Sequence, residues 1–507
     1  MKIYTKEGDN VRLIAMPGEE VNVGEYLTIT DRGGRQLIVQ VFDVQYANVQ
    51  GVFEDLLRGE ILNGALEGSD VDPMGVSDQI AFVKDAKLLM CKVRGVGSSL
   101  SLEYNPWGSF LPSRTNSKVE RLPLQRLMGS GGSGMSLKLG VACDSNLYVD
   151  VRNLDGKLNI ITGRKGTGKS HLSKALLLGL LDHGAPCMVL DINGEYVNLG
   201  VNLDGSRNRY HSRIKALKPG VNFKFQLSSL SLDSVLNVLA YALDLPWNSI
   251  RTFIQIWQRL KQDGKLSLES LNEAVKSWRC HETIREALES RCATLINSKV
   301  FDDEGGVDFV QLSPFLEKGG AIVIDLKDQN SVNRRIIVEL VLSKLKDLLY
   351  TKRLPAVFLF AEEAHLYLRE TYWDDVVTRM RHLGLFTTFI TNQPDTIREN
   401  IYRQADNLFI FNFLNERDVE TVSKSTKIDG ESVKRMVKAL PPRHCLVVGD
   451  VVNNFPVVVE VKELKVKTMG ETRLFFSVKE TLHPRGTPTP IHANLETVHR
   501  NTENPGN

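Results

Sequence analysis

The sequence predicts an α/β protein in which a small β-rich domain precedes a parallel-sheet core, and a helical insertion interrupts that core. From about residue 137 onward, short apolar runs alternate with helical patterns, which is typical of parallel strands joined by crossover helices. Residues 229–299 are helical in pattern almost throughout. Residues 1–100 hold several short strand-like runs with no helix between them, which favours a small β-barrel.

Composition is that of an ordinary globular protein. The 507 residues exceed what one hydrophobic core usually serves, so two or three domains are expected. With 63 basic and 61 acidic residues the formal net charge is +2, so a nucleic-acid site would have to be local. No apolar run is long enough to span a bilayer, and the first residues lack an apolar signal core. We therefore expect a cytoplasmic protein with no membrane partner.

Domain boundaries follow from the changes of pattern. Residues 129–134 read GSGGSG, a flexible segment that looks engineered and takes no part in the fold prediction. The expected parts are 1–100, an N-terminal β-barrel; 101–136, a connector; 137–228 and 300–465, the two parts of the core; 229–299, the helical insertion; and 466–507, a C-terminal arm or tail.

In the N-terminal part, strands are expected at Val11–Met16, Glu25–Thr30 and Gln36–Val44, and within Gln79–Val93. The turn Asp31–Arg35 contains two glycines and indicates a hairpin. No catalytic constellation occurs here, so we expect a structural or assembly role.

The core begins with a phosphate-binding motif. Gly163–Ser170 matches G-x-x-x-x-G-K-[ST], between an apolar strand at Leu158–Thr162 and a helix at His171–Leu181. This arrangement gathers backbone N–H groups and a helix N-terminus around one point, which suits a polyphosphate. Lys169 would reach the β- and γ-phosphates, and Ser170 would bind Mg²⁺. The expected nucleotide-binding residues here are Gly163, Arg164, Lys165, Gly166, Thr167, Gly168, Lys169, Ser170 and His171.

Carboxylates follow two further strands of the core. Cys187–Ile192 contains Asp191 at its end, where ligands bind in parallel sheets, and Asp191 is therefore also placed in the nucleotide site. The strand Ala356–Phe360 is followed by Glu362 and Glu363. If the strand continues, these two side chains point to opposite sides of the sheet, so one can bind the metal and the other can act on the attacking water. We assign Glu362 to the metal, through water, and Glu363 to the attacking water.

The next strand, Phe386–Thr391, ends in Asn392-Gln393-Pro394, and an amide there can touch the γ-phosphate. Gln393 is the expected contact, with an ordinary loop amide as the alternative. Arg379 and Arg381 precede this strand. Either one can neutralise transition-state charge or lie on a solvated helix face.

These motifs carry a family resemblance. After a β-rich N-terminal domain, the strings GRKGTGKS, DINGEY, FLFAEEAH and TNQP occur in this order. The chain resembles the HerA–FtsK group, and HerA-type proteins in particular, over residues 1–100 and 137–465. The resemblance implies a RecA-like P-loop NTPase core preceded by a small barrel. It also implies a homo-hexameric, ATP- and Mg²⁺-dependent translocase or helicase with double-stranded DNA in its channel. A NurA-type nuclease in DNA end processing and recombination is the implied partner.

The resemblance also implies roles for single residues. Glu363 would be the catalytic glutamate, Gln393 the sensor and Arg381 an arginine acting in cis. The family's trans-acting arginine corresponds in position to Lys157, with Arg152 nearby. Lysine lacks the planar fork of arginine, which leaves open which of the two acts in trans.

We expect Lys169 and Glu363 on neighbouring strand ends of one pocket. Candidate DNA contacts form a basic cluster, although the pattern favours a solvated surface loop: Arg207, Arg209, Arg213 and Lys215. An ATP-driven protein remodeller and an NTP-gated assembly scaffold are the alternative functions.

Overall fold

The structure is a computed structural model that describes residues 1–47, 85–97, 102–105, 110–128, 134–303, 305, 309–367, 375–426 and 428–466. Apart from their first or last residue, the expected linker 129–134 and arm 466–507 lie outside these ranges. Within the described ranges, no helix combines the length and apolar character needed to cross a bilayer.

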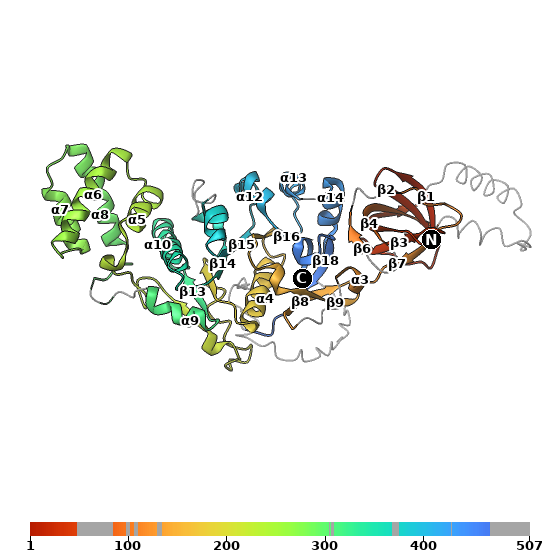
Figure 1. The fold of residues 1–507 in the computed structure, drawn as a ribbon, viewed down its shortest axis with the longest axis horizontal. Helices are drawn as coiled ribbons and strands as arrows, with labels where there is room; N and C mark the ends of the chain where they lie inside the picture. The colour runs from red at the N-terminus through yellow and green to blue at the C-terminus, as the bar shows by residue number, and fades with distance from the viewer. Residues whose placement is uncertain are drawn as a thin grey trace, which may run out of the picture. The chain divides into compact units, whose positions relative to one another are not determined.

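The N-terminal part is an antiparallel sheet (Figure 1). Its strands run in the spatial order β1-β2-β5-β4-β3-β7, with β6 paired to β5. They are β1 (Lys2–Glu7), β2 (Asn10–Ala15), β3 (Tyr26–Thr30), β4 (Gln36–Tyr46), β5 (Lys87–Gly97), β6 (Leu102–Tyr104) and β7 (Lys118–Arg121). The expected closed barrel is not established, because no backbone ladder between the described residues joins the end strands β1 and β7. The sheet also extends past residue 100, since β6 and β7 belong to it.

The core is a second sheet, with the order β12-β13-β11-β14-β15-β10-β16-β17-β18-β8-β9 among the described residues. Its strands are β8 (Ser136–Ala142), β9 (Ser145–Asp150), β10 (Asn159–Thr162), β11 (Cys187–Asp191), β12 (Ile214–Leu217), β13 (Ala321–Asp325), β14 (Val357–Glu362), β15 (Leu385–Thr391), β16 (Asn407–Phe411), β17 (His444–Gly449) and β18 (Val457–Val461). The pairings from β12 to β16 are parallel, and those from β16 to β9 are antiparallel.

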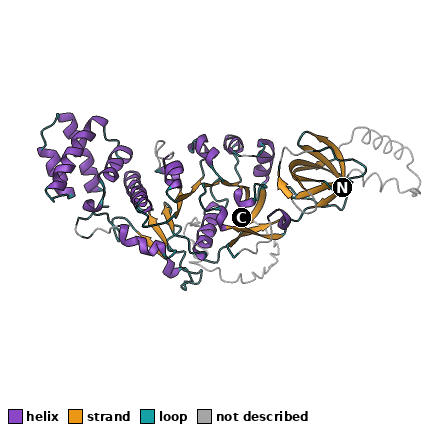
Figure 2. Cartoon of the chain, in the orientation of Figure 1, coloured by secondary structure: helices purple, strands orange, loops and turns teal. Residues whose placement is uncertain are grey.

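Helices cover both faces of this sheet (Figure 2). They are α3 (Leu124–Met128), α4 (Lys169–Asp182), α9 (Ser313–Glu317), α10 (Ser331–Tyr350), α12 (Glu399–Gln404), α13 (Glu416–Ser425) and α14 (Gly430–Ala439). The expected insertion contains α5 (Leu232–Asn237), α6 (Trp247–Gln262), α7 (Leu268–Ser277) and α8 (Glu282–Asn297). The two faces alternate along β10: Ile160 packs in the core that includes α10 and α14, and Ile161 in the core that includes α4.

The strand order corrects one expectation about the site. Strand β15 lies between β10, which leads into the phosphate-binding motif, and β14, which carries Glu362. The two motifs are therefore next-but-one neighbours, and the end of β15 lies between them.

Candidate nucleotide site

The loop after β10 turns through three glycines with positive φ. Gly163, Gly166 and Gly168 have φ of 153°, 81° and 117°. A Cβ on Gly163 would lie 2.4 Å from the Cβ of Phe411, at the end of β16. The sequence needs glycine here both for the backbone conformation and for this close packing.

Neighbouring backbone holds the loop in place. The Arg164 N–H donates to the Asn412 carbonyl at 3.1 Å, and the Arg443 N–H donates to the Thr167 carbonyl at 3.0 Å. The side chains of Arg164 and Lys165 are exposed. The loop is thus fixed from outside while its interior faces α4.

Lys169 is the first residue of α4, and its side chain is buried. Its ammonium donates to the Arg164 carbonyl at 3.0 Å. Burial lowers the pKa of Lys169, and the nearby charges of Glu363 and Glu362 act in the opposite direction. The Lys169 ammonium therefore lies within range of the charges of both glutamates.

Glu362 ends β14 and is only 1% exposed. Neither of its carboxylate oxygens has a hydrogen-bond partner among the described residues. Burial raises the pKa of Glu362 well above its ordinary value, the charges of Glu195 and Asp191 raise it further, and Lys174 and Ser170 oppose them. A buried carboxylate beside the Ser170 hydroxyl has oxygens of the kind that can bind the water shell of a metal ion.

Glu363 leaves the strand in a left-handed conformation, with φ of 44°. Such strain in a residue other than glycine is common at functional sites. Its Oε1 accepts a hydrogen bond from Asn392 Nδ2 at 3.1 Å, and its Oε2 lies 3.6 Å from His365 Nδ1. The turn separates the two glutamates, so Glu362 faces Ser170 while Glu363 faces the end of β15.

The amide that the structure brings to Glu363 is Asn392. Gln393 is exposed, and its hydrogen bonds to other described residues run through its backbone, as in the bond from its N–H to Thr391 Oγ1 at 3.0 Å. The TNQP string indicated an amide at this strand end. The register of β15 against β14 decides whether Asn392 or Gln393 faces β14.

Asp191 supports the loop that follows β11. Its carboxylate accepts from the N–H groups of Glu195, at 2.9 Å, and Tyr196, at 2.8 Å. Burial raises the pKa of Asp191 to about 6. Glu195 in turn accepts from the buried Lys174 ammonium at 2.7 Å. Each Asp191 oxygen thus accepts one backbone N–H, and its place as a nucleotide contact stays a prediction.

Arg381 was expected to act on the phosphates in cis and Lys157 in trans. The two residues lie together at the amino ends of the parallel strands. Arg381 donates to the Gly156 carbonyl at 2.7 Å and lies 3.1 Å from Asp406. Lys157 pairs with Asp406, at 3.8 Å, and with Asp450. We call Lys157, Arg381, Asp406 and Asp450 the amino-edge cluster. Arg152, also before β10, pairs with Asp150.

This position corrects the expected role of Arg381. Gly156 precedes β10 and the phosphate loop follows it, and β10 has 4 residues. At the usual rise per residue, the strand separates the two ends by about 13 Å. Arg381 therefore cannot reach the phosphate loop of its own chain.

His171 and two residues of the predicted basic cluster are bonded to other residues of the same chain. His171 accepts from the Leu464 N–H at 2.9 Å, so it braces the chain after β18. In the basic cluster, Arg209 pairs with Asp182 at 2.6 Å, and Arg213 donates to the Gly319 carbonyl at 2.9 Å.

Comparisons with known proteins agree with this geometry. Residues 137–354 match the family described as Helicase HerA, central domain. The curated proteins give no match. VirB4 of Thermoanaerobacter pseudethanolicus aligns with a TM-score of 0.51 at 15% identity, over 66% of this chain and 98% of VirB4. The bacterial conjugative coupling protein TrwBdeltaN70 aligns with a TM-score of 0.50 at 14% identity, over 68% of this chain and 92% of its own.

At these identities the two structures support the fold alone, an α/β core with one large sheet, as the sequence predicted. The family match covers the phosphate loop, β11 and the helical insertion. Residues 137–354 are therefore similar to the central domain of HerA helicases, within an α/β fold that the two aligned structures share.

Proposed function

We propose that this protein is a ring-forming, ATP-dependent translocase or helicase of double-stranded DNA. One observation carries the ATPase part of this proposal. The buried Glu362 carboxylate lies beside the Ser170 hydroxyl, and its charge also acts on Lys169 at the start of α4. A phosphate loop next to oxygen ligands suited to hydrated metal supports nucleotide hydrolysis.

The loop glycines and Lys169 would bind the ATP phosphates. Lys169 would leave the Arg164 carbonyl, its present acceptor, for the β- and γ-phosphates. Ser170 and, through water, Glu362 would hold Mg²⁺, which when bound neutralises charge on the phosphate oxygens. The donor set fits because hydroxyl and carboxylate oxygens are the ligands that Mg²⁺ prefers.

Glu363 would orient and activate the attacking water. Its Oε1 is held by Asn392, while its Oε2 has no hydrogen-bond partner among the described residues. The free oxygen would accept a proton from water, and the amide would keep the carboxylate aimed. Gln393 remains the proposed sensor of the γ-phosphate, from the same strand end.

The remaining positive charge would come from the neighbouring subunit of a homo-hexamer. Lys157, with Arg152 nearby, is the proposed trans-acting group, and Arg381 shares its edge of the sheet. Lys157 would have to exchange its present partners for phosphate. An inter-subunit site would make hydrolysis depend on ring assembly.

The HerA central domain supports the choice of DNA as the polymer that moves. Contacts to the phosphate backbone would be tolerant of sequence and weakened by salt. Arg207 and Lys215 are the proposed contacts. A NurA-type nuclease, acting with the ring in end processing and recombination, is the proposed partner.

The test is ATP turnover of the full chain with and without duplex DNA. Wild-type turnover should rise with DNA, and Glu363→Gln should still bind ATP while its turnover falls by about 100-fold or more. Glu317→Gln, an exposed glutamate on α9, is the matched control and should turn over normally.

Near wild-type turnover of Glu363→Gln would remove the glutamate from its role. A wild-type enzyme indifferent to duplex DNA would favour the ATP-driven protein remodeller. Absence of hydrolysis even in a single turnover would favour the NTP-gated scaffold.

A further inference from the structure

Helix α14 touches the phosphate loop region at its carboxyl end. Asn412, directly after β16, accepts from the Arg164 N–H and donates to the carbonyls of Leu440, at 2.9 Å, and Lys438, at 3.2 Å. Arg443, shortly after the helix, donates to the Thr167 carbonyl. Asn412 therefore links the loop to the carboxyl end of α14, and Arg443 links the loop to the segment that follows the helix.

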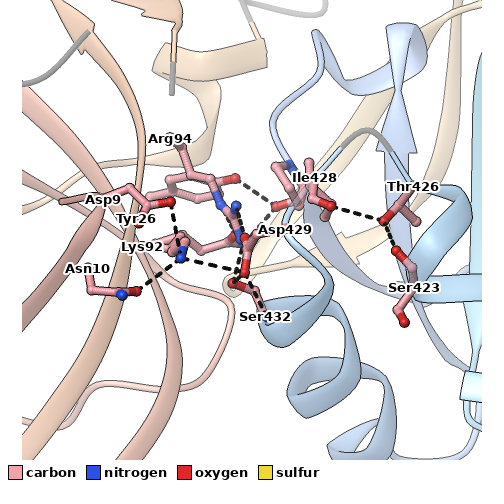
Figure 3. Close-up of polar contacts among 12 residues, drawn as sticks. Asp9, Asn10, Tyr26, Lys92, Arg94, Ser423, Thr426, Ile428, Asp429 and Ser432 are labelled. Atoms are coloured by element: carbon pink, nitrogen blue, oxygen red, sulfur yellow. Dashed lines mark hydrogen bonds and ion pairs between the residues drawn. The ribbon is translucent and has the colours of Figure 1, made fainter. Parts of the chain in front are cut away.

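The amino end of the same helix is bonded to the N-terminal sheet (Figure 3). Asp429 caps α14 by accepting from the N–H and hydroxyl of Ser432, at 2.9 and 2.7 Å. Its Oδ2 accepts from Arg94 of β5 at 2.7 Å, and its Oδ1 lies 3.9 Å from the ammonium of Lys92, also on β5. The Arg94 side chain is 2% exposed and the Asp429 side chain is 23% exposed, so water and salt reach this ion pair from the Asp429 side.

Further contacts fix the same junction. Arg435, on α14, pairs with Asp43 of β4. Gln40, which accepts from Arg94 at 3.0 Å, donates to the Pro456 carbonyl at 2.7 Å. Tyr26 donates to the same carbonyl at 2.8 Å. The junction thus joins the N-terminal sheet both to α14 and to the segment before β18.

We propose that α14 is a rigid strut that couples the nucleotide state of the phosphate loop to the N-terminal sheet. The helix has 10 residues, and a helix of this size is about 15 Å long and resists bending. Since both ends are hydrogen-bonded, a shift of the loop on nucleotide binding moves Asp429 against Arg94. This inference rests on the proposed nucleotide site, and it assigns the N-terminal sheet as the element that senses the bound state.

The test is hydrogen–deuterium exchange of the full chain, with and without Mg²⁺ and a slowly hydrolysed ATP analogue. In the wild type, the analogue should slow exchange in the phosphate loop and also change exchange in β5. Asp429→Asn keeps a good helix cap, because asparagine caps as well as aspartate, but removes the charge that Arg94 needs. The expected result is loop protection as in the wild type with the β5 response lost.

Lys438→Ala is the matched control. This residue lies on α14 and pairs with the exposed Glu416, away from the N-terminal sheet, so the β5 response should survive. Should Asp429→Asn disturb folding, the Asp43→Asn variant removes the outer ion pair and should diminish the same response.

The possible results distinguish the proposal that α14 is a strut from the proposal of the nucleotide site. Loop protection without any β5 response in the wild type would overturn the strut and leave the nucleotide site standing. An undiminished β5 response in Asp429→Asn would also overturn the strut alone. Failure of the analogue to protect the loop at all would overturn the nucleotide site and the strut with it.

Discussion

At the scale of single residues, the site depends on how two adjacent glutamates diverge. Glu362 completes β14 and is buried, whereas Glu363 turns out of the strand with φ of 44°. The sequence predicted the divergence from strand alternation, but the left-handed turn produces it. The same turn brings Glu363 to Asn392 and His365.

The contact between Asn392 and Glu363 leads to a kinetic prediction. Asn392→Ala removes the donor to Oε1, so the carboxylate is aimed less well while the phosphate contacts remain. We expect kcat for ATP to fall by about 10- to 100-fold, with KM changed by less than about three-fold. Steady-state turnover over a range of ATP concentrations measures both constants.

Partial recovery in Asn392→Gln, which restores an amide donor, would distinguish orientation from a general packing defect. A rise in KM with kcat preserved would contradict the assignment. A larger loss of kcat in Gln393→Ala than in Asn392→Ala would place the decisive amide at Gln393.

The sequence was sufficient to place some residues of the candidate site but not others. The proposed grouping of Lys169, Ser170, Glu362 and Glu363 could be made from the sequence because each residue lies in a motif next to a strand end. Asn392 and Arg381 could not be placed in this way. Strand register decides which side chain faces the pocket, and the packing of the segment before β15 takes Arg381 to the far edge of the sheet.

At the scale of elements, helix α10 buries a carboxyl group outside the site. Glu339 is 4% exposed, and its Oε2 has no partner among the described residues. Burial raises the pKa of Glu339 from 4.5 to about 8. The folded chain therefore keeps a proton that the unfolded chain loses, and stability falls as pH rises between these two values.

Glu339→Gln should remove that dependence. We expect the variant to be more stable than the wild type at pH 7, by an amount on the order of 2 kcal/mol, and the gain to shrink towards pH 5. Thermal unfolding across this pH range is the measurement, with the exposed Glu317→Gln as control. A gain that does not vary with pH would contradict the buried-acid explanation.

Elements were predicted best where burial leaves a continuous apolar run. The parallel strands β10, β11, β14 and β15 lie within about two residues of the expected bounds. The β8–β9 hairpin was not predicted, because the hydrophobic pattern of the segment that begins near residue 137 did not indicate a strand. It is defined by pairing with β18, and long-range pairing leaves little local signal.

At the scale of the whole molecule, the amino-edge cluster supplies the test of a shared site. Lys169→Ala should inactivate the phosphate loop of its own subunit, and Lys157→Ala the site of the neighbour. Each variant alone should show little turnover. Mixed rings contain some junctions with both lysines intact, so we expect activity to return on mixing.

ATP turnover of mixed variants at constant total protein is the measurement, with native mass confirming the ring. No recovery from rings shown to be mixed would argue for a Lys157 that acts within its own subunit. A Lys157→Ala protein with normal turnover would remove this lysine from catalysis.

The change from parallel to antiparallel pairing at β16 has a practical consequence. Strand β18, near the end of the described chain, hydrogen-bonds to β8, which precedes the phosphate loop. A recombinant fragment cut to residues 137–354 would lose β14 to β18 and leave β8 and β9 without their neighbour. Any shortened version meant for crystallisation must therefore retain both ends of the core, and removal of the N-terminal sheet must leave Ser136 onward intact.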